Sequence, residues 1–270
     1  PLINQSQIIG TAAGNQQVNM MTGIFEQLLP ELIRAQDDLF RCKSTNEKQQ
    51  LKDRISDLRD ALVRVQLEGA SAEVMARYEE SRHAASKPYV LWQLDFARVF
   101  REKGGFDIVI GNPPYVQLQK AISEDSDIKL GDLYINQGFE SFAKTGDIYC
   151  LFYEKGYHLL HHNGILAFIT SNKWMRAGYG EKLRGFFAKN TNPLILLDFA
   201  GQKIFESATV DVNILVYEKA QNAAQTTACI IKENCGSNLS VYVKQNATTM
   251  SFINAENWAI MSHVEQSIKQ

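Results

Sequence analysis

The stretch FDIVIGNPPYVQ, residues 106–117, decides the fold because an apolar strand and a rigid corner meet within it. The apolar run at 108–110 is typical of a parallel strand covered on both faces. Two prolines then end the strand, since proline lacks an N–H donor and fixes its own backbone. This stretch therefore predicts a β-sheet in which one strand ends at a corner with little conformational freedom.

Downstream of this corner the pattern alternates between helix and strand, which indicates an α/β fold. Apolar residues recur at helical spacing over 147–161 and 180–189. Apolar runs at 165–170, 194–199 and 210–217 predict three further strands. No helix separates the last two runs, so we expect them to form an antiparallel pair at one side of an otherwise parallel sheet.

Upstream of the corner the pattern is helical. Apolar residues fall near helical spacing from Met20 to Leu39, and Ser44 and Glu47 have the spacing of a capping box for a second helix. We expect an antiparallel helical hairpin, with room for a third helix over 71–84. Acidic and basic residues are nearly balanced in this region, which favours a packed or solvated arm over a DNA-binding one.

Composition limits the class of protein. The 270 residues are 45% hydrophobic with a formal charge of −2, which excludes a globally basic nucleic-acid binder but not a local basic patch. The four cysteines form no C-x-x-C pair, so we expect reduced thiols of a cytoplasmic protein and no metal site. No apolar run approaches the ~20 residues that span a bilayer, so no membrane partner is expected.

The corner itself offers hydrogen-bond acceptors at a place where reactive groups gather. In open α/β sheets the ligand crevice lies beyond the carboxyl ends of the strands, and Asn112 follows such an end. Pro113 and Pro114 hold the residues before them extended, so the Asn112 side-chain oxygen and the Pro113 carbonyl can converge on one amino group. Tyr115 supplies a flat face beside that point. A plain turn is the alternative interpretation.

The N-P-P-Y motif at 112–115 resembles the catalytic motif of S-adenosylmethionine-dependent amino-methyltransferases. Two flanking stretches narrow the resemblance: GDIYCLFYEKGYHLLHHNGILAFITSNKWMRAGYGEKLRGFF at 146–187 and KIFESATVDVNILVYEK at 203–219. Both are similar to adenine-specific DNA methyltransferases of type II restriction–modification systems, particularly the large single-chain type IIG enzymes. The resemblance covers residues 86–220 and implies the C-terminal half of a Rossmann-like methyltransferase sheet, with parallel strands and an antiparallel last strand.

The resemblance implies roles for the corner residues. The motif consists of Asn112, Pro113, Pro114 and Tyr115. Asn112 and Pro113 would hold the exocyclic N6 of an adenine flipped out of double-stranded DNA. Tyr115 would stack on that base, and Phe205 matches a second stacking position, with a role in the core as its alternative.

Further roles follow from the segments after the corner. Tyr149 and Phe152 match positions beside the adenine of S-adenosylmethionine, although core packing is an equal alternative for Phe152. Lys173 and Arg176 belong to a mainly basic segment after the strand at 165–170, and we expect them to contact DNA phosphates. A solvated helix face is the alternative for this segment.

The glycine-rich cofactor loop implied by the resemblance is not found ahead of the corner, where GTAAGN at 10–15 is the nearest candidate. The chain also begins at Pro1 rather than Met. We therefore expect an internal piece of a longer polypeptide, with a helical arm at 1–86, the catalytic half at 87–220, and a linker and the start of a target-recognition region at 221–270.

The parent polypeptide would supply the cofactor-binding half and the target-recognition domain. The sequence does not decide whether the parent also has a nuclease domain. On this interpretation the piece alone does not methylate DNA. Two rival hypotheses remain: a protein glutamine-N5 methyltransferase, because a side-chain amide also presents an NH2 group, and a non-catalytic DNA-binding or scaffold fragment.

Overall fold

The computed structural model describes residues 16–83, 90–123, 127–202, 204, 210–232 and 238–261. The chain divides into two compact units, Pro1–Glu102 and Lys103–Gln270. Each unit has its own hydrophobic core, so each is described by itself.

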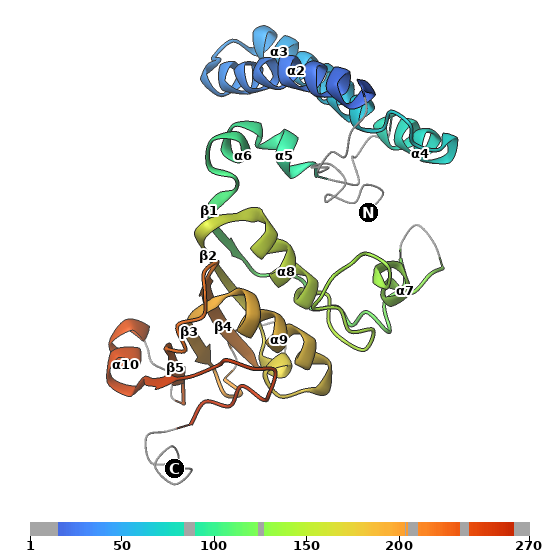
Figure 1. Ribbon diagram of the computed structural model, residues 1–270. Helices are drawn as coiled ribbons and strands as arrows, with labels where there is room; N and C mark the ends of the chain where they lie inside the picture. The colour runs from blue at the N-terminus through green and yellow to red at the C-terminus, as the bar shows by residue number, and fades with distance from the viewer. Residues whose placement is uncertain are drawn as a thin grey trace. The chain divides into compact units, whose positions relative to one another are not determined.

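The first unit is helical, as the sequence predicts. Its helices are α2 (Gln16–Arg41), α3 (Thr45–Gln66), α4 (Ala72–His83), α5 (Trp92–Asp95) and α6 (Ala97–Lys103), the last ending at the unit boundary. The two long helices α2 and α3 form the expected antiparallel hairpin (Figure 1). Ser44 caps α3 by accepting a hydrogen bond from the Glu47 backbone N–H, which confirms the predicted helix start.

The core of the first unit lies along the hairpin seam and extends past the predicted boundary at 86. Leu32 and Leu62 have no exposed surface, and they pack in one cluster with Leu94 and Ala97. Because these last two residues pack with the hairpin, the compact unit runs to Glu102 instead of ending near Lys87.

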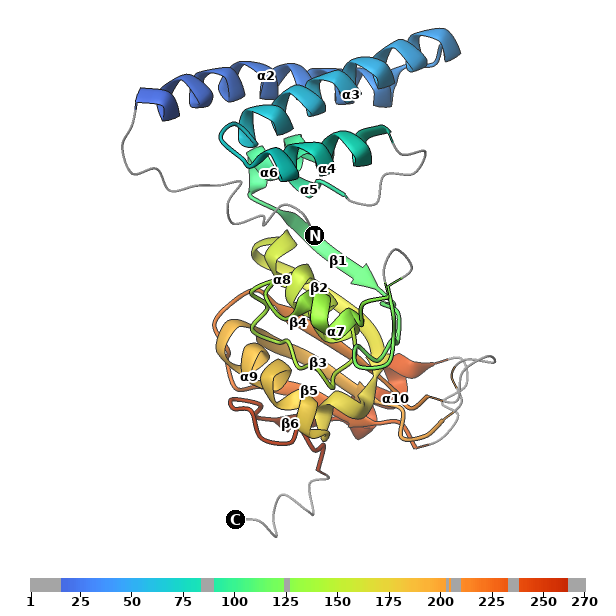
Figure 2. The same cartoon turned by 90° about the vertical axis from the view of Figure 1, so that its right-hand side faces the viewer.

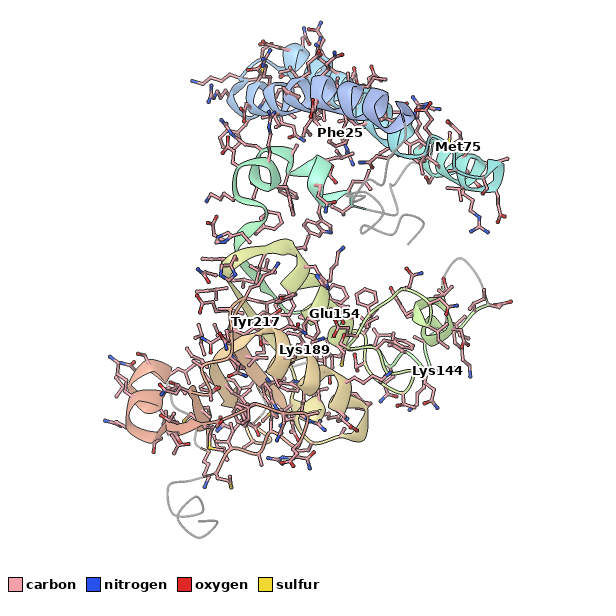
Figure 3. All side chains as sticks on the ribbon, viewed as in Figure 1. Phe25, Met75, Lys144, Glu154, Lys189 and Tyr217 are labelled. Atoms are coloured by element: carbon pink, nitrogen blue, oxygen red, sulfur yellow. The ribbon has the colours of Figure 1, made fainter. Side chains whose placement is uncertain are left out.

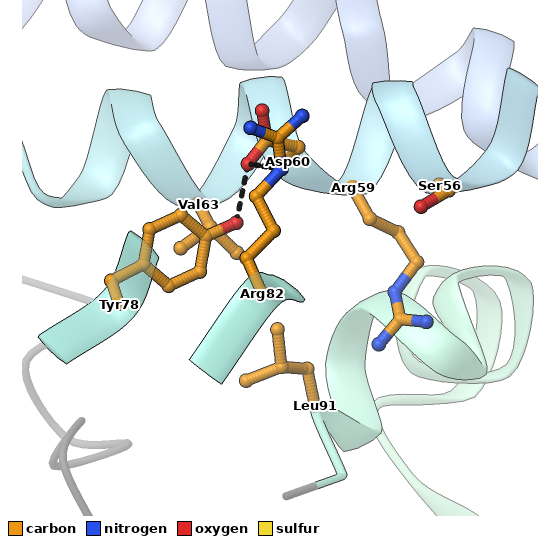
Figure 4. A pocket seen from close by; sticks show the side chains of 7 residues that line it. All are labelled: Ser56, Arg59, Asp60, Val63, Tyr78, Arg82 and Leu91. Atoms are coloured by element: carbon orange, nitrogen blue, oxygen red, sulfur yellow. Dashed lines mark hydrogen bonds and ion pairs between the residues drawn. The ribbon is translucent and has the colours of Figure 1, made fainter. Parts of the chain in front are cut away.

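Ion pairs join the short helices of this unit to α3. The Asp60 carboxylate accepts a hydrogen bond of 2.7 Å from the Tyr78 hydroxyl and pairs with Arg82 at 3.1 Å (Figure 4). Arg59 pairs with Asp95 at 2.7 Å. The two contacts of Asp60 fasten α4 to α3, and the Arg59–Asp95 pair fastens α5 to α3.

The second unit is a six-stranded mixed sheet with helices. Its strands are β1 (Phe106–Gly111), β2 (Leu160–Ser171), β3 (Asn192–Asp198), β4 (Val212–Glu218), β5 (Thr226–Ile230) and β6 (Thr248–Met250). Their spatial order is β1-β2-β4-β3-β5-β6. The β1–β2 and β3–β5 pairs are parallel, whereas β4 runs antiparallel to both β2 and β3 and β6 runs antiparallel to β5.

The α/β class and the antiparallel pairing of the strands at 192–198 and 212–218 are confirmed. The position of that pair differs from the prediction, because β4 lies inside the sheet between β2 and β3. The sheet also continues past this pair. The expected linker stops at Thr226, where β5 begins and pairs with β3.

Helices cover one face of this sheet and form the main hydrophobic core of the unit with it. The helices and turns of this unit are α7 (Leu130–Tyr134), α8 (Tyr149–Leu159), the 3-10 turns η1 (Asn172–Met175) and η2 (Gly178–Gly180), α9 (Glu181–Asn190) and α10 (Leu239–Asn246). Both α8 and α9 lie on the same side of the sheet (Figures 1 and 2). Their aromatic side chains, Tyr153 and Phe187, pack at 5.1 Å between ring centroids, and Tyr153 also packs on Phe168 of β2.

The other face is only partly covered, which differs from the expectation for β1. Ile108 is 60% exposed and Ile110 is 77% exposed. Their neighbours across the ladder, Ile165 and Ala167 of β2, are half-buried. The apolar run predicted the strand correctly. A run of this kind does not show whether other segments of the same chain cover both faces of the strand.

Candidate functional site

The corner lies where the sequence predicts it, directly after the last residue of β1. Asn112 is exposed, Pro113 is buried and Pro114 is exposed. Among the described residues, none forms a hydrogen bond with the Asn112 side chain. The amide of Asn112 is therefore open to a ligand, while the buried ring of Pro113 anchors the turn that carries it.

The strand directions bring the corner and the basic segment to the same edge of the sheet. The strands β1, β2 and β3 run the same way, so their carboxyl ends share one edge of the sheet. Asn112 follows β1, Lys173 follows β2, and Asp198 is the last residue of β3. The topology thus gathers the corner and the basic segment as the sequence predicts.

Tyr115 is half-buried beside the corner. Its hydroxyl lies 3.4 Å from the Ile169 carbonyl oxygen, and its ring meets the ring of Tyr149 edge-on, with 6.1 Å between centroids and 83° between planes. A T-shaped contact covers at most one face of the Tyr115 ring, so Tyr149 leaves at least one of its faces uncovered. The geometry is compatible with the stacking role proposed for Tyr115.

Asp147 holds the exit from the corner. Its carboxylate accepts a hydrogen bond of 2.8 Å from the N–H of Val116, the residue after Tyr115. Two backbone hydrogen bonds continue this contact, from Ile148 N–H to the Val116 carbonyl at 2.9 Å and from Leu118 N–H to the Gly146 carbonyl at 3.0 Å. Residues 116–118 are thus tied to 146–148, which immediately precede α8.

Electrostatics at Asp147 reflect its surroundings. Burial raises the pKa of its carboxyl above the ordinary value, against the opposing effect of backbone N–H groups and of the nearby Lys173 charge. The spacing of apolar residues from 147 onward predicts Asp147 as the N-cap of the helix, but α8 begins one residue later: its N-cap is Ile148, which makes no side-chain cap hydrogen bond. The Asp147 carboxylate instead binds the N–H of Val116, a contact that the sequence gives no sign of.

A second buried carboxylate fixes the loop between the corner and α8. Glu154 lies on α8 (Figure 3). Its carboxylate accepts hydrogen bonds from the backbone N–H groups of Glu140 at 3.0 Å and Ser141 at 2.7 Å. Burial alone would raise the pKa of Glu154, but hydrogen bonds from His158, Ser141 and Glu140 outweigh it and the pKa lies below its ordinary value. The carboxylate is therefore held charged and the loop is held to the helix.

The basic segment after β2 surrounds a surface hollow lined by Asn172, Lys173, Arg176 and Ala177. Lys173 and Arg176 are exposed, as expected of residues that contact DNA phosphates. Arg176 lies 3.7 Å from the buried carboxylate of Asp198, which also accepts a hydrogen bond of 2.8 Å from the Asn172 amide. Asp198 thus fixes one wall of the hollow.

Arg184 shapes the same segment from inside. Its side chain is buried, and it donates hydrogen bonds to the carbonyls of Trp174 at 2.5 Å, Ala177 at 3.0 Å and Ala255 at 2.9 Å. The sequence shows Arg184 only as one more basic residue of the segment, whereas the structure assigns it to the support of η1. A buried arginine in a basic stretch carries no sequence signal that separates it from its exposed neighbours.

The two residues expected beside the cofactor differ in exposure. Phe152 is 40% exposed on α8, so its ring is available for contact with a ligand. Tyr149 has no exposed surface, and its hydroxyl is hydrogen-bonded to that of Tyr179 at 2.8 Å. The aromatic pattern of this helix start could not separate the outward ring from the buried one.

Phe205, the second expected stacking residue, lies outside the described residues. So does the candidate loop at 10–15. Over the described ranges, no group of three His, Cys, Asp or Glu side chains is arranged to hold a metal ion. In that same part of the chain, every helix is too short or too polar to cross a bilayer.

Comparison with known proteins gives several similar chains. Over 166 residues this chain is 30% identical to the type II methyltransferase M.PaeR7I of Pseudomonas aeruginosa, an alignment covering 58% of this chain and 28% of the relative. Over 114 residues it is 29% identical to the type II restriction enzyme and methyltransferase RM.Eco57I of Escherichia coli, covering 42% of this chain and 11% of the relative. The chain thus spans less than a third of the length of either relative.

A solved structure of a nuclease-deletion mutant of the type ISP restriction–modification enzyme LlaGI in complex with a DNA substrate mimic is also similar. It is 15% identical with a TM-score of 0.43, covering 67% of this chain and 18% of that one. The profile of the Eco57I restriction-modification methylase family matches residues 19–205, which include the corner, α8 and the basic segment. The chain belongs to the Eco57I restriction-modification methylase family.

Proposed function

We propose that this chain carries the catalytic corner of an enzyme that methylates the N6 amino group of adenine in DNA. One observation carries the proposal: the Asn112 amide is exposed, unengaged by the described residues, and placed at the carboxyl edge of the sheet beside the Tyr115 ring. Membership of the restriction-modification methylase family supports the reaction class.

The chemistry follows from acceptors at the corner. The Asn112 side-chain oxygen and the Pro113 carbonyl oxygen accept hydrogen bonds from the two N–H groups of one amino nitrogen. Two fixed acceptors draw the nitrogen away from planarity, so its lone pair is less delocalised into the ring and more able to attack an electrophile. S-adenosylmethionine, when bound, supplies the methyl group. The corner is rigid, so the acceptors require little reorganisation during the reaction.

The target base would leave the duplex to reach the corner. Extruding a base costs a few kcal/mol, and stacking on an aromatic ring returns about 1–3 kcal/mol per contact. Tyr115 is proposed as one ring for this contact and Phe205 as the second. Two rings would roughly offset the cost of base flipping.

Lys173 and Arg176 are proposed to bind phosphates of double-stranded DNA. Both are exposed at the hollow after β2. The positive charge of Lys173 acts to lower the pKa of the Asp147 carboxyl. Asp147 binds the N–H of the residue after Tyr115, so the effect of the Lys173 charge on Asp147 supports a phosphate contact near the corner. Such contacts position the duplex and carry no sequence information themselves.

A cofactor-binding half is proposed to come from elsewhere in a longer parent polypeptide, together with a target-recognition domain. Phe152 fits the adenine side of S-adenosylmethionine, because its ring is 40% exposed among buried neighbours. The free edge of β1 and the exposed Ile108 and Ile110 fit a partner segment that extends the sheet and covers this face. On this proposal the piece alone is inactive.

The test uses the full-length protein with tritium-labelled S-adenosylmethionine and unmethylated genomic DNA, so that no recognition sequence need be known. Digestion of the DNA to nucleosides should place the label in N6-methyladenine. Label in a cytosine derivative, or in a glutamine-containing protein substrate offered in parallel, would overturn the proposal. Absence of any transfer would favour a DNA-binding or scaffold role.

A further inference from the structure

Three tyrosines connect the corner to the basic segment. Tyr115 follows the two prolines, Tyr149 begins α8, and Tyr179 lies in η2, within the segment that carries Lys173 and Arg176. The rings of Tyr115 and Tyr149 meet in a T-shaped contact, with 6.1 Å between their centroids. The hydroxyls of Tyr149 and Tyr179 are 2.8 Å apart, so one donates a hydrogen bond to the other.

We propose that Tyr149 and Tyr179 are positioning residues that hold the ring of Tyr115 in place for stacking on the target base. This inference rests on the proposed function. It assigns Tyr149 a role different from direct cofactor contact, since the side chain of Tyr149 is fully buried between the Tyr115 ring and its hydroxyl partner.

The contact requires tyrosine and not only an aromatic ring. A buried hydroxyl costs free energy unless it is hydrogen-bonded, and the fully buried hydroxyl of Tyr149 meets this need through Tyr179. Phenylalanine at either position would preserve the ring but would remove the bond that fixes its orientation.

A second contact ties Tyr179 to the exit of the corner. A Cβ on Gly146 would lie 3.4 Å from the Tyr179 ring, so this ring packs directly on the Gly146 backbone. Gly146 in turn pairs with Leu118 and precedes Asp147, which binds Val116. Tyr179 therefore contacts both supports of Tyr115, the Tyr149 ring behind it and the backbone that leaves it.

The consequence is a physical connection between DNA contact and base stacking. Tyr179 follows Arg176 within the turn that Arg184 and Asp198 hold. A shift of this turn when DNA binds would be carried through the hydroxyl pair to the Tyr149 ring and to Tyr115.

The first arm of the test reports on Tyr115 without DNA or cofactor. The protein is labelled with 3-fluorotyrosine, and its ten tyrosine signals are observed by fluorine NMR, with Tyr115→Phe identifying the Tyr115 signal. Tyr179→Phe and Tyr149→Phe should each shift or broaden that signal. Tyr157→Phe is the matched control, because Tyr157 also lies on α8 and no described residue hydrogen bonds to its hydroxyl.

The second arm measures methyl transfer by the full-length protein. Tyr179→Phe should lower kcat by about threefold to tenfold, the effect of one lost hydrogen bond, with KM for S-adenosylmethionine unchanged. An unaltered Tyr115 signal in both hydroxyl variants, or a change in KM for the cofactor alone, would overturn the positioning role. A wild-type protein that transfers no methyl group would overturn the proposed function, and the NMR arm would still report on the coupling.

Discussion

At the residue scale, the shape of the corner depends on single carboxylates that bind backbone N–H groups. Asp147 binds the N–H of Val116, and Glu154 binds those of Glu140 and Ser141. An unpaired buried N–H is costly, so each carboxylate helps to fix the path of the loop whose N–H groups it binds. The N-P-P-Y motif in the sequence predicts neither of these carboxylate contacts.

Replacement of Asp147 separates its two properties, the acceptor and the charge. Asp147→Ala should lower the free energy of unfolding by roughly 1–3 kcal/mol, because the Val116 N–H loses its acceptor. Asp147→Asn keeps an acceptor oxygen and removes the cost of the partly buried charge, so its stability should equal or exceed that of the wild type. Urea unfolding of the three proteins measures the difference.

The pH dependence follows from the raised pKa of Asp147. The folded protein binds this proton more tightly than the unfolded chain, so the contribution of Asp147 to stability falls as pH rises from the ordinary carboxyl range through the raised pKa. The advantage of Asp147→Asn over the wild type should be larger at about pH 7 than at about pH 4. Equal differences at both pH values would contradict this account.

At the scale of elements, Glu154 joins α8 to the loop before it. Glu154→Gln should lower the free energy of unfolding by roughly 1–3 kcal/mol, because an amide can accept at one oxygen only and turns its NH2 toward the second N–H. The matched control is Glu256→Gln, an exposed position. Since the pKa of Glu154 is lowered, the wild-type advantage should be present above the ordinary carboxyl pKa and be lost as pH falls through the lowered value.

Two glycines of η2 provide a matched pair for the turn that carries the basic residues. A Cβ on Gly180 would lie 2.0 Å from the Trp174 carbonyl oxygen, whereas one on Gly178 would have no heavy atom within 4 Å. Gly180→Ala should therefore cost about 1–3 kcal/mol or more, and Gly178→Ala should be nearly neutral. Thermal unfolding compares them, and equal melting temperatures would contradict the observed packing of this turn.

The sequence predicted these elements well where the pattern is local. The Ser44 cap, the hairpin, α9 and the strand before the corner all follow from spacing or capping rules. The same rules could not place β4 between β2 and β3, because strand order depends on long-range pairing. They also could not show that Tyr149 is buried and Phe152 is exposed, since both fit the same aromatic pattern.

At the scale of the whole molecule, α8 and α9 cover one face of the sheet (Figure 2), and Ile108 and Ile110 of β1 are left exposed by the described part of the chain. Exposed Ile108 and Ile110 at a free strand edge are unfavourable in water, which supports a partner segment at this edge. The corner and the basic segment share one edge of the sheet, because β1, β2 and β3 run in the same direction.

The proposal for the cofactor has a direct calorimetric test. S-adenosylmethionine titrated into this chain should give no heat that fits a tight site, because the glycine-rich loop is proposed to lie elsewhere in the parent. The full-length protein should give a saturable isotherm under the same conditions. Tight binding by this chain alone would contradict the proposed division of the site.

The central claim is that the exposed Asn112 amide accepts a hydrogen bond from the reacting amino group. Its most direct measurement is the rate of methyl transfer to DNA by the full-length protein carrying Asn112→Ala, compared with the exposed control Gln119→Ala. Loss of one fixed polar group at a reaction centre costs on the order of 100-fold or more in kcat, so Asn112→Ala should fall by that factor with an unchanged melting temperature while the control stays near the wild-type rate. A rate for Asn112→Ala within about twofold of the wild type, far from the loss expected for a reacting-centre contact, would contradict the account.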